Sequence, residues 1–216
     1  MTATSPSAIR AVDLAALVAG KLCHDFISPA GAITSGLDLL KDPSAQDMRE
    51  DALALIEQSA SKMVALVHFA RVAFGASTTA ERFSAEAIRD LAEALLAGGR
   101  ARLAWRLEVQ DLSKVQARAL LNLAYMTVGA LPSGGEAVIE VVAEGEEIRL
   151  AGRAAGPRAR LKPEATTGLA GEVLIEGLHG QWIQPYWLWL TVTEAGGRLA
   201  IHTQEDQVAL TCLMPV

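Results

Sequence analysis

Two long runs of apolar residues, spaced three and four apart, fill the first third of the sequence. The first covers residues 8–41, and its stripe consists of Leu22, Phe26, Ala30, Ile33, Leu37 and Leu40. The segment 42–44, with Pro43 at its centre, supplies a turn and a new helix start, because proline disfavours helical geometry in the residue before it. The second stripe then consists of Ala52, Ile56, Ser59, Met63, Leu66, Ala70 and Ala73. This pattern predicts a helical hairpin.

The hairpin predicts a homodimer, because two helices of this length bury only one stripe between them. The remaining apolar surface needs other helices, most simply those of a second copy, which would give a dimeric four-helix bundle. The small, polar stretch 75–81 has no periodicity and is typical of a linker. We therefore expect the hairpin at residues 1–76, a linker at 77–83 and a second domain at 84–216.

The second domain is expected to mix helices and strands. Helical patterns occupy residues 84–96, 113–131 and 184–194, and strand-like patterns occupy 103–109, 138–142, 148–150, 198–203 and 207–214. The stretch between 150 and 184 is rich in loop residues. This alternation predicts a sheet covered by helices, an α/β sandwich, so the whole chain is expected to be α+β.

Composition excludes several classes of protein. The formal net charge of −6 has the wrong sign for a protein that binds nucleic-acid phosphates, and 51% hydrophobic residues indicate a folded chain. Cys23 and Cys212 belong to no metal-binding motif, which favours reduced cytosolic thiols and no metal site. The N-terminus lacks the basic region of a signal peptide, and no run of about 18 apolar residues could span a bilayer. We expect a cytoplasmic protein that binds neither nucleic acid nor membrane.

The segment 21–29 is the most informative stretch for function. It places His24 beside Asp25, with Pro29 inside the helical pattern, where its ring crowds the carbonyl of Asp25 and predicts a bend or a loosened turn. At 100° per residue, His24 points away from the apolar stripe and is expected to face solvent. The residues expected to dock another protein beside it are mostly small or polar: Gly20, Ser28, Pro29, Gly31 and Ser35.

These side chains suit phosphoryl transfer. An imidazole is a nucleophile near neutral pH, an adjacent carboxylate can hold its orientation and tautomer, and a lysine can offset phosphate charge. His24, Asp25 and Lys21 match these three roles. The alternative, that His24 is an ordinary exposed histidine on a helix, stays open on the local chemistry alone.

Three parts of the chain resemble sensor histidine kinases. His24-Asp25, the proline five positions after the histidine and the segment 32–40 resemble the phospho-acceptor box; residues 119–124 resemble the start of the asparagine box; and 194–199 with 213–215 resemble the end of the ATP-binding domain. The residues that bind nucleotide depart from the pattern. Met126 stands where a second asparagine is expected, the acidic box is replaced by 154–158, and 166–171 is a weak glycine-rich segment.

An acceptor histidine joined to a degenerate ATP-binding domain resembles the histidine phosphotransferases of the ChpT type. The resemblance implies a dimer that does not bind ATP and does not phosphorylate itself. It implies that His24 accepts a phosphoryl group, on the ring nitrogen farther from the backbone, from the receiver domain of a hybrid histidine kinase. The group would pass to aspartates of response-regulator receiver domains, which would bring Mg²⁺ with them, so no cofactor of the chain's own is expected.

Two other functions stay open as alternatives. One is a sensor histidine kinase core that uses ATP in an unusual pocket, which Met126 and Ala154 disfavour. The other is a non-catalytic dimeric regulator that binds receivers, which the spacing from His24 to Pro29 disfavours.

Other conspicuous residues have ordinary interpretations. His68 is expected at the surface, and His179, in a loop, and His202, in a strand, are expected to be structural. The aromatic cluster of Trp182, Tyr186, Trp187 and Trp189 is expected in the core. The basic run of Arg158, Arg160 and Lys162 is expected in a solvated loop that could touch an acidic receiver.

Overall fold

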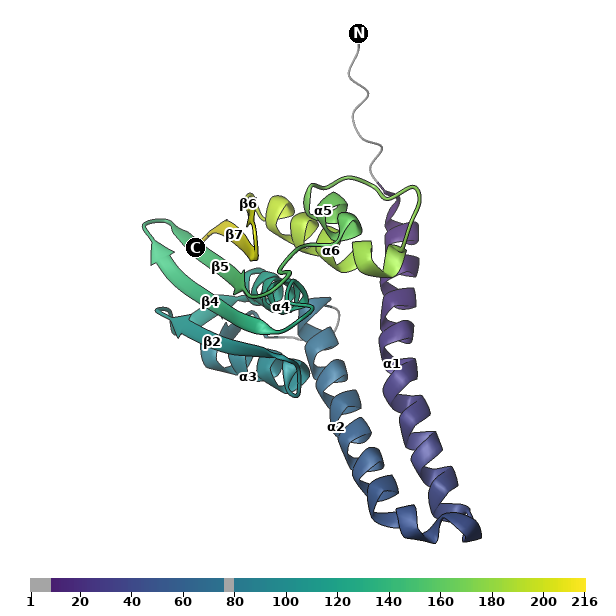
Figure 1. Cartoon of the computed structure of the whole chain (residues 1–216). Helices are drawn as coiled ribbons and strands as arrows, with labels where there is room; N and C mark the ends of the chain where they lie inside the picture. Colours follow the sequence, from purple (N-terminus) through teal and green to yellow (C-terminus); the bar gives the residue numbers. More distant parts are fainter. Residues whose placement is uncertain (1–8, 76–79) are drawn as a thin grey trace.

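The N-terminal part of the protein is a long helical hairpin, as predicted. The computed structural model describes residues 9–75 and 80–216. Helix α1 (Ala11–Lys41) is followed by a short 3₁₀ helix, η1 (Pro43–Met48), and by α2 (Arg49–Ala73). Asp42 caps η1, because its carboxylate accepts a hydrogen bond of 2.8 Å from the backbone N–H of Ser44. Figure 1 shows the closed end of the hairpin projecting away from the rest of the molecule.

The two helices approach closely at Gly36. A Cβ atom added there would lie 2.7 Å from Cγ1 of Ile56, so only glycine fits without a shift of α2. Other apolar side chains of the hairpin remain exposed, among them Ile27, Val64 and Val67. The structure contains one copy of the chain, and the dimeric four-helix bundle therefore stays a prediction.

The second domain is built on a five-stranded mixed sheet. The spatial order of its strands is β2 (Ala101–Leu107), β4 (Gly135–Glu144), β5 (Glu147–Ala155), β7 (Gln207–Pro215) and β6 (Arg198–Gln204). Strands β2 and β4 are parallel, and the other neighbours are antiparallel. One face packs against helices α3 (Ala85–Leu96), α4 (Lys114–Gly129) and α6 (His179–Glu194). The predicted α+β fold, a hairpin followed by an α/β sandwich, is confirmed.

Several elements differ from the prediction. The loop-rich stretch contains a further helix, α5 (Pro163–Leu169), which packs on α6, and α6 itself begins at His179 instead of residue 184. A two-stranded sheet pairs β1 (Arg82–Ser84) with β3 (Asp111–Ser113). Strand β1 takes up the end of the segment 77–83 expected as a linker, of which residues 77–79 lie outside the described residues. Three-residue strands are too short to produce a periodic pattern.

Helix α6 joins the second domain to the start of α1. Its buried residues Trp182, Ile183 and Tyr186 form a cluster with apolar side chains of the first turns of α1, and the rings of Trp182 and Tyr186 stack with centroids 4.6 Å apart. The indole N–H of Trp187 donates a hydrogen bond of 2.9 Å to the carbonyl of Ala73, the last residue of α2. The aromatic cluster is therefore core, as expected, and it fixes the hairpin to the second domain.

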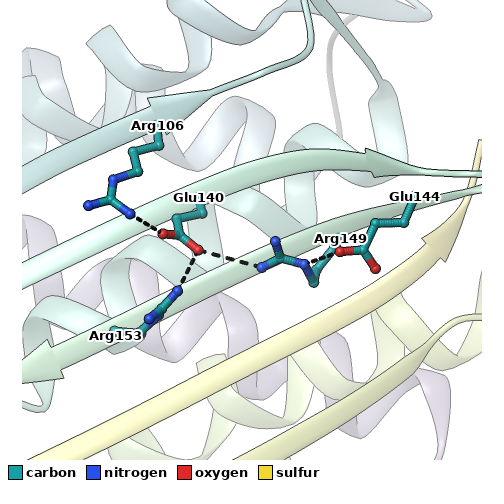
Figure 2. A network of polar contacts seen from close by, with 5 residues as sticks. All are labelled: Arg106, Glu140, Glu144, Arg149 and Arg153. Atoms are coloured by element: carbon teal, nitrogen blue, oxygen red, sulfur yellow. Dashed lines mark hydrogen bonds and ion pairs between the residues drawn. The ribbon is translucent and has the colours of Figure 1, made fainter.

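The opposite face of the sheet carries a charged network (Figure 2). The carboxylate of Glu140, with 8% of its side chain exposed, accepts hydrogen bonds of 2.8 Å from both Arg106 and Arg153, and Arg149 lies 3.5 Å away. The guanidinium of Arg149 also donates a hydrogen bond of 2.5 Å to the carboxylate of Glu144. The hydrogen bond from Arg153 is the main cause that lowers the pKa of Glu140 below its ordinary value.

Candidate functional site

His24 projects from α1 into solvent. Its side chain is 84% exposed, in agreement with its angular position on the helix, and its Nδ1 lies 3.3 Å from Oδ1 of Asp25. When the carboxylate of Asp25 accepts the proton of Nδ1, the lone pair of the neutral ring is on Nε2. The structure thus brings together the histidine and the acid that the sequence singled out.

Lys21 lies beneath this pair and, with His24 and Asp25, lines the open space beside it. It is 7% exposed, its Nζ donates to Oδ2 of Asp25, and Nζ sits 5.3 Å from the centre of the Tyr125 ring of α4. The ammonium group thus contacts both a carboxylate and an aromatic face, and its expected role of offsetting phosphate charge stays a prediction.

Two residues near Asp25 were not anticipated from the sequence. Lys62 of α2 interacts electrostatically with Asp25 and donates a hydrogen bond to the carbonyl of Leu95; burial lowers the pKa of Lys62, and Asp25 opposes this. Tyr125 lies between α1 and α2, with its ring centroid 5.9 Å from that of Phe69. No local motif marks either residue, because their proximity to Asp25 arises only from the packing of α2 and α4 on α1.

The expected docking residues fall into two groups. Gly20, Ser28, Gly31 and Ser35 are exposed on α1, and a Cβ atom added at either glycine would meet nothing within 4 Å. Pro29 is the exception, because it is buried and lines a small cavity with Leu66 and Leu95. The same cavity is lined by His24 and Ser28, and a part for Pro29 in docking stays a prediction.

A cavity of about 580 Å³ opens beside His24. One wall is α1, another is formed by Tyr125 and Met126 of α4, and a third carries basic side chains and the start of α6. The residues of this third wall include Arg160, Lys162 and His179. The expectation that His179 lies in a loop is wrong, since it is the first residue of α6 and is exposed.

The positions that resemble the nucleotide-binding motifs of kinases carry inward-facing or apolar side chains. Asn122, which matches the asparagine box, is fully buried, and its amide donates to the carbonyls of Ala73 and Arg118 at 3.0 and 2.8 Å. Its Oδ1 accepts a hydrogen bond of 3.2 Å from Gln184. Met126 offers no oxygen to a magnesium ion, and Ala154 is buried on the helix-covered face of β5. The side-chain amide of Asn122 is therefore engaged in hydrogen bonds within the protein.

The other candidates lie apart from Asp25. His68 is exposed on α2 in a shallow groove lined by small and apolar residues such as Ala60 and Val64. The imidazole Nε2 of His202 is 2.7 Å from the side-chain amide of Gln204. Arg158 is exposed, but its guanidinium donates two hydrogen bonds to Ser133, at 2.9 and 2.6 Å. Within residues 9–75 and 80–216, no helix is both long and apolar enough to cross a membrane.

Known proteins resemble this chain over nearly its whole length. Protein phosphotransferase ChpT of Brucella abortus (strain 2308) is 33% identical over 205 residues, covering 94% of this chain and 97% of that protein. A solved bacterial phosphotransferase superposes with a TM-score of 0.85 at 30% identity, covering 97% of this chain and 100% of the other. Full-length ShkA in complex with AMPPNP gives a TM-score of 0.51 at 17% identity, over 96% of this chain and 46% of that one. This last likeness concerns the fold alone.

The family comparison covers the second domain. Residues 85–207, more than half of the chain, match the family described as histidine phosphotransferase C-terminal domain. This stretch runs from α3 to the start of β7 and includes the cavity wall opposite His24. Together with the identity to ChpT over nearly the full length, this match shows that the chain belongs to the histidine phosphotransferase family.

Proposed function

We propose that the protein relays phosphoryl groups between receiver domains through His24. It would accept the group from the receiver domain of a hybrid histidine kinase and pass it to aspartates of response-regulator receiver domains. The observation that carries this proposal is the exposed imidazole of His24, whose Nδ1 faces the Asp25 carboxylate at 3.3 Å while Nε2 is left for chemistry.

The proposed transfer is a single displacement in each direction. The lone pair of Nε2 forms the N–P bond as the bond between phosphorus and the receiver's aspartyl oxygen breaks, and the aspartate leaves as a carboxylate. The proton on Nδ1 stays there, held by the Asp25 carboxylate, and the negative charge of that carboxylate stabilises the positive charge that develops on the ring. The onward step reverses this exchange on the second receiver, and each receiver brings its own Mg²⁺.

We propose that ATP is not the phosphoryl donor. The inward-facing amide of Asn122 and the methionine at position 126 support this proposal, because a kinase needs polar side chains that face the metal and the phosphates. An ATP-using kinase core would need a different set of side chains around this cavity.

The proposed complex is a homodimer with receivers docked beside each His24. Exposed apolar side chains on both hairpin helices, such as Ile27 and Val64, support the dimer. The open surface around Gly20 and Gly31 would admit the receiver's backbone, and the basic side chains Arg160 and Lys162 across the cavity would attract an acidic receiver. The two free cysteines support a cytoplasmic location.

The test is a phosphotransfer assay with a matched histidine control. The purified protein is incubated with labelled ATP alone and with a receiver domain labelled on its aspartate, as wild type, His24→Gln and His68→Gln. We expect label from the receiver only, lost in His24→Gln and retained in His68→Gln, which removes another exposed helical histidine. Label from ATP alone would establish a kinase, and label retained in His24→Gln would refute the acceptor assignment.

A further inference from the structure

We infer that Tyr125 and Lys21 are positioning residues for His24, acting through Asp25. The inference deepens the proposed function: the second domain does not only offer a docking surface but also sets the tautomer of the acceptor imidazole. The chain of contacts runs from the aromatic ring of Tyr125 on α4, through the ammonium group of Lys21 and the carboxylate of Asp25, to Nδ1 of His24.

The two oxygens of the Asp25 carboxylate have different hydrogen-bond partners. Oδ1 faces His24 Nδ1 at 3.3 Å, and Oδ2 accepts from Lys21 Nζ. A carboxylate that rotates freely would lose the first contact, because adjacent residues on a helix do not face each other. The bond to Lys21 removes this rotation, so Lys21 decides whether Asp25 meets the imidazole.

The pair of Lys21 and Asp25 needs support from outside α1. A lysine that precedes its acid by four residues is the weaker arrangement on an isolated helix, and exposed pairs of this kind contribute little. Here Lys21 is only 7% exposed, and its Nζ lies 5.3 Å from the ring centre of Tyr125. A desolvated cation over an aromatic face is attracted to it, and the ring also restricts the conformers of the lysine chain.

Tyr125 is itself held in place. Its ring contacts Phe69 of α2, with centroids 5.9 Å apart, and α4 is anchored to the end of α2 through Asn122. The ring therefore has a fixed position relative to α1, and a fixed ring gives a fixed ammonium group. These contacts are made by the ring and not by the hydroxyl group, which makes phenylalanine the conservative replacement for Tyr125.

The experiment reads the tautomer of His24 directly. Nitrogen-15 NMR of histidine-labelled protein at about pH 8.5, where imidazoles are neutral, distinguishes a proton on Nδ1 from one on Nε2. We expect the Nδ1–H form in wild type and in Tyr125→Phe, and a mixture of both tautomers in Lys21→Met and Tyr125→Leu. Trp187→Leu is the matched control, because Trp187, like Tyr125, joins the second domain to α2 but contacts Arg118 instead of Lys21.

The same variants are then compared in receiver-to-protein transfer. We expect Lys21→Met and Tyr125→Leu to slow transfer by about 10- to 100-fold, with Tyr125→Phe within about twofold of wild type. If Tyr125→Leu does not fold, Lys21→Met, which keeps an unbranched apolar side chain at this buried position, still tests the chain of contacts. The tautomer does not depend on His24 being the acceptor, so the NMR result stands apart from any failure of the proposed function.

Three outcomes would overturn the inference. The first is an unchanged Nδ1–H tautomer in Lys21→Met, which would show that Asp25 needs no lysine. The second is a loss of the tautomer in Tyr125→Phe, which would point to the hydroxyl group and not to the ring. The third is a loss of the Nδ1–H tautomer in Trp187→Leu as large as that in Tyr125→Leu. This result would show that the tautomer changes because the junction between the domains loosens.

Discussion

The side-chain amide of Asn122, midway along α4, donates a hydrogen bond of 3.0 Å to the backbone carbonyl of Ala73, the last residue of α2. The carbonyls near a helix C-terminus have no partner within the helix, and this bond satisfies one of them. Asn122, which lies in the segment that resembles the asparagine box of kinases, thus holds the hairpin against the second domain.

Replacement of Asn122 should therefore cost stability. Asn122→Ala leaves the buried amide of Gln184 without this acceptor and the Ala73 carbonyl with Trp187 as its remaining side-chain donor. We expect a loss of about 2 kcal/mol in the free energy of unfolding. Urea denaturation followed by tryptophan fluorescence measures it. A variant as stable as wild type would show that water replaces the amide.

Substitutions at Gly31 should affect the stability of α1 and the docking of a receiver in different ways. Because a Cβ atom at Gly31 would meet nothing within 4 Å, Gly31→Ala should raise the free energy of unfolding by about 0.5 to 1 kcal/mol. Gly31→Leu should fold equally well but slow phosphotransfer from a receiver more than about tenfold, since its side chain would occupy the docking face. Normal transfer by Gly31→Leu would place the receiver elsewhere on α1.

The network around Glu140 should make stability depend on pH in the acid range. The folded-state pKa of Glu140 is lowered, chiefly by Arg153, so its contribution is complete above the ordinary glutamate pKa and is lost as pH falls through the lowered value. At pH 7 we expect Glu140→Gln to cost about 1 kcal/mol in the free energy of unfolding, because Arg106 and Arg153 are largely exposed and therefore screened by solvent.

The pH profile provides the check on this prediction. Between about pH 5 and pH 3, the unfolding free energy of wild type should fall more steeply than that of Glu140→Gln, in which this group no longer titrates. Parallel curves for the two proteins would contradict the pKa shift. Added salt should reduce the difference in unfolding free energy between wild type and Glu140→Gln at pH 7, because it screens the charges.

The two cysteines should differ in reactivity. Burial raises the pKa of the Cys212 thiol to about 12, whereas Cys23 is exposed on α1. A disulfide reagent at about pH 8 should therefore modify one thiol in the native protein and two after denaturation, because the thiolate is the reacting form. A Cys23→Ser variant that still reacts rapidly when native would mean that β7 opens.

Periodicity accounts for most of the fold that was predictable. The stripes in residues 8–41 and 52–73 predicted the hairpin, since a long amphipathic run has a strong 3.6-residue signal. Helix α5 was missed because its seven residues are too few for that signal, although Pro163 stands at its first turn, a position that favours proline. The start of α6 was missed because Gly180 and Pro185 interrupt the pattern.

The sequence predicted only those features of the site that depend on residues close together along the chain. The angular position of His24 predicted its exposure, and its neighbour Asp25 followed from the sequence directly. The burial of Lys21 could not be foreseen, because it depends on Tyr125, which lies about a hundred positions away along the chain. The same holds for Pro29, whose ring is covered by residues of α2 and α3.

The aromatic cluster between α6 and α1 has a consequence for the exchange of partners. Because Trp182 and Tyr186 pack against the first turns of α1, a visiting receiver meets two surfaces whose relative placement is already set. The two domains do not have to be ordered relative to each other when the receiver binds, so the entropic cost of association is lower. A smaller contact area is then enough to recognise the receiver. A small contact area also separates quickly, and a carrier that serves successive partners depends on rapid release as much as on recognition.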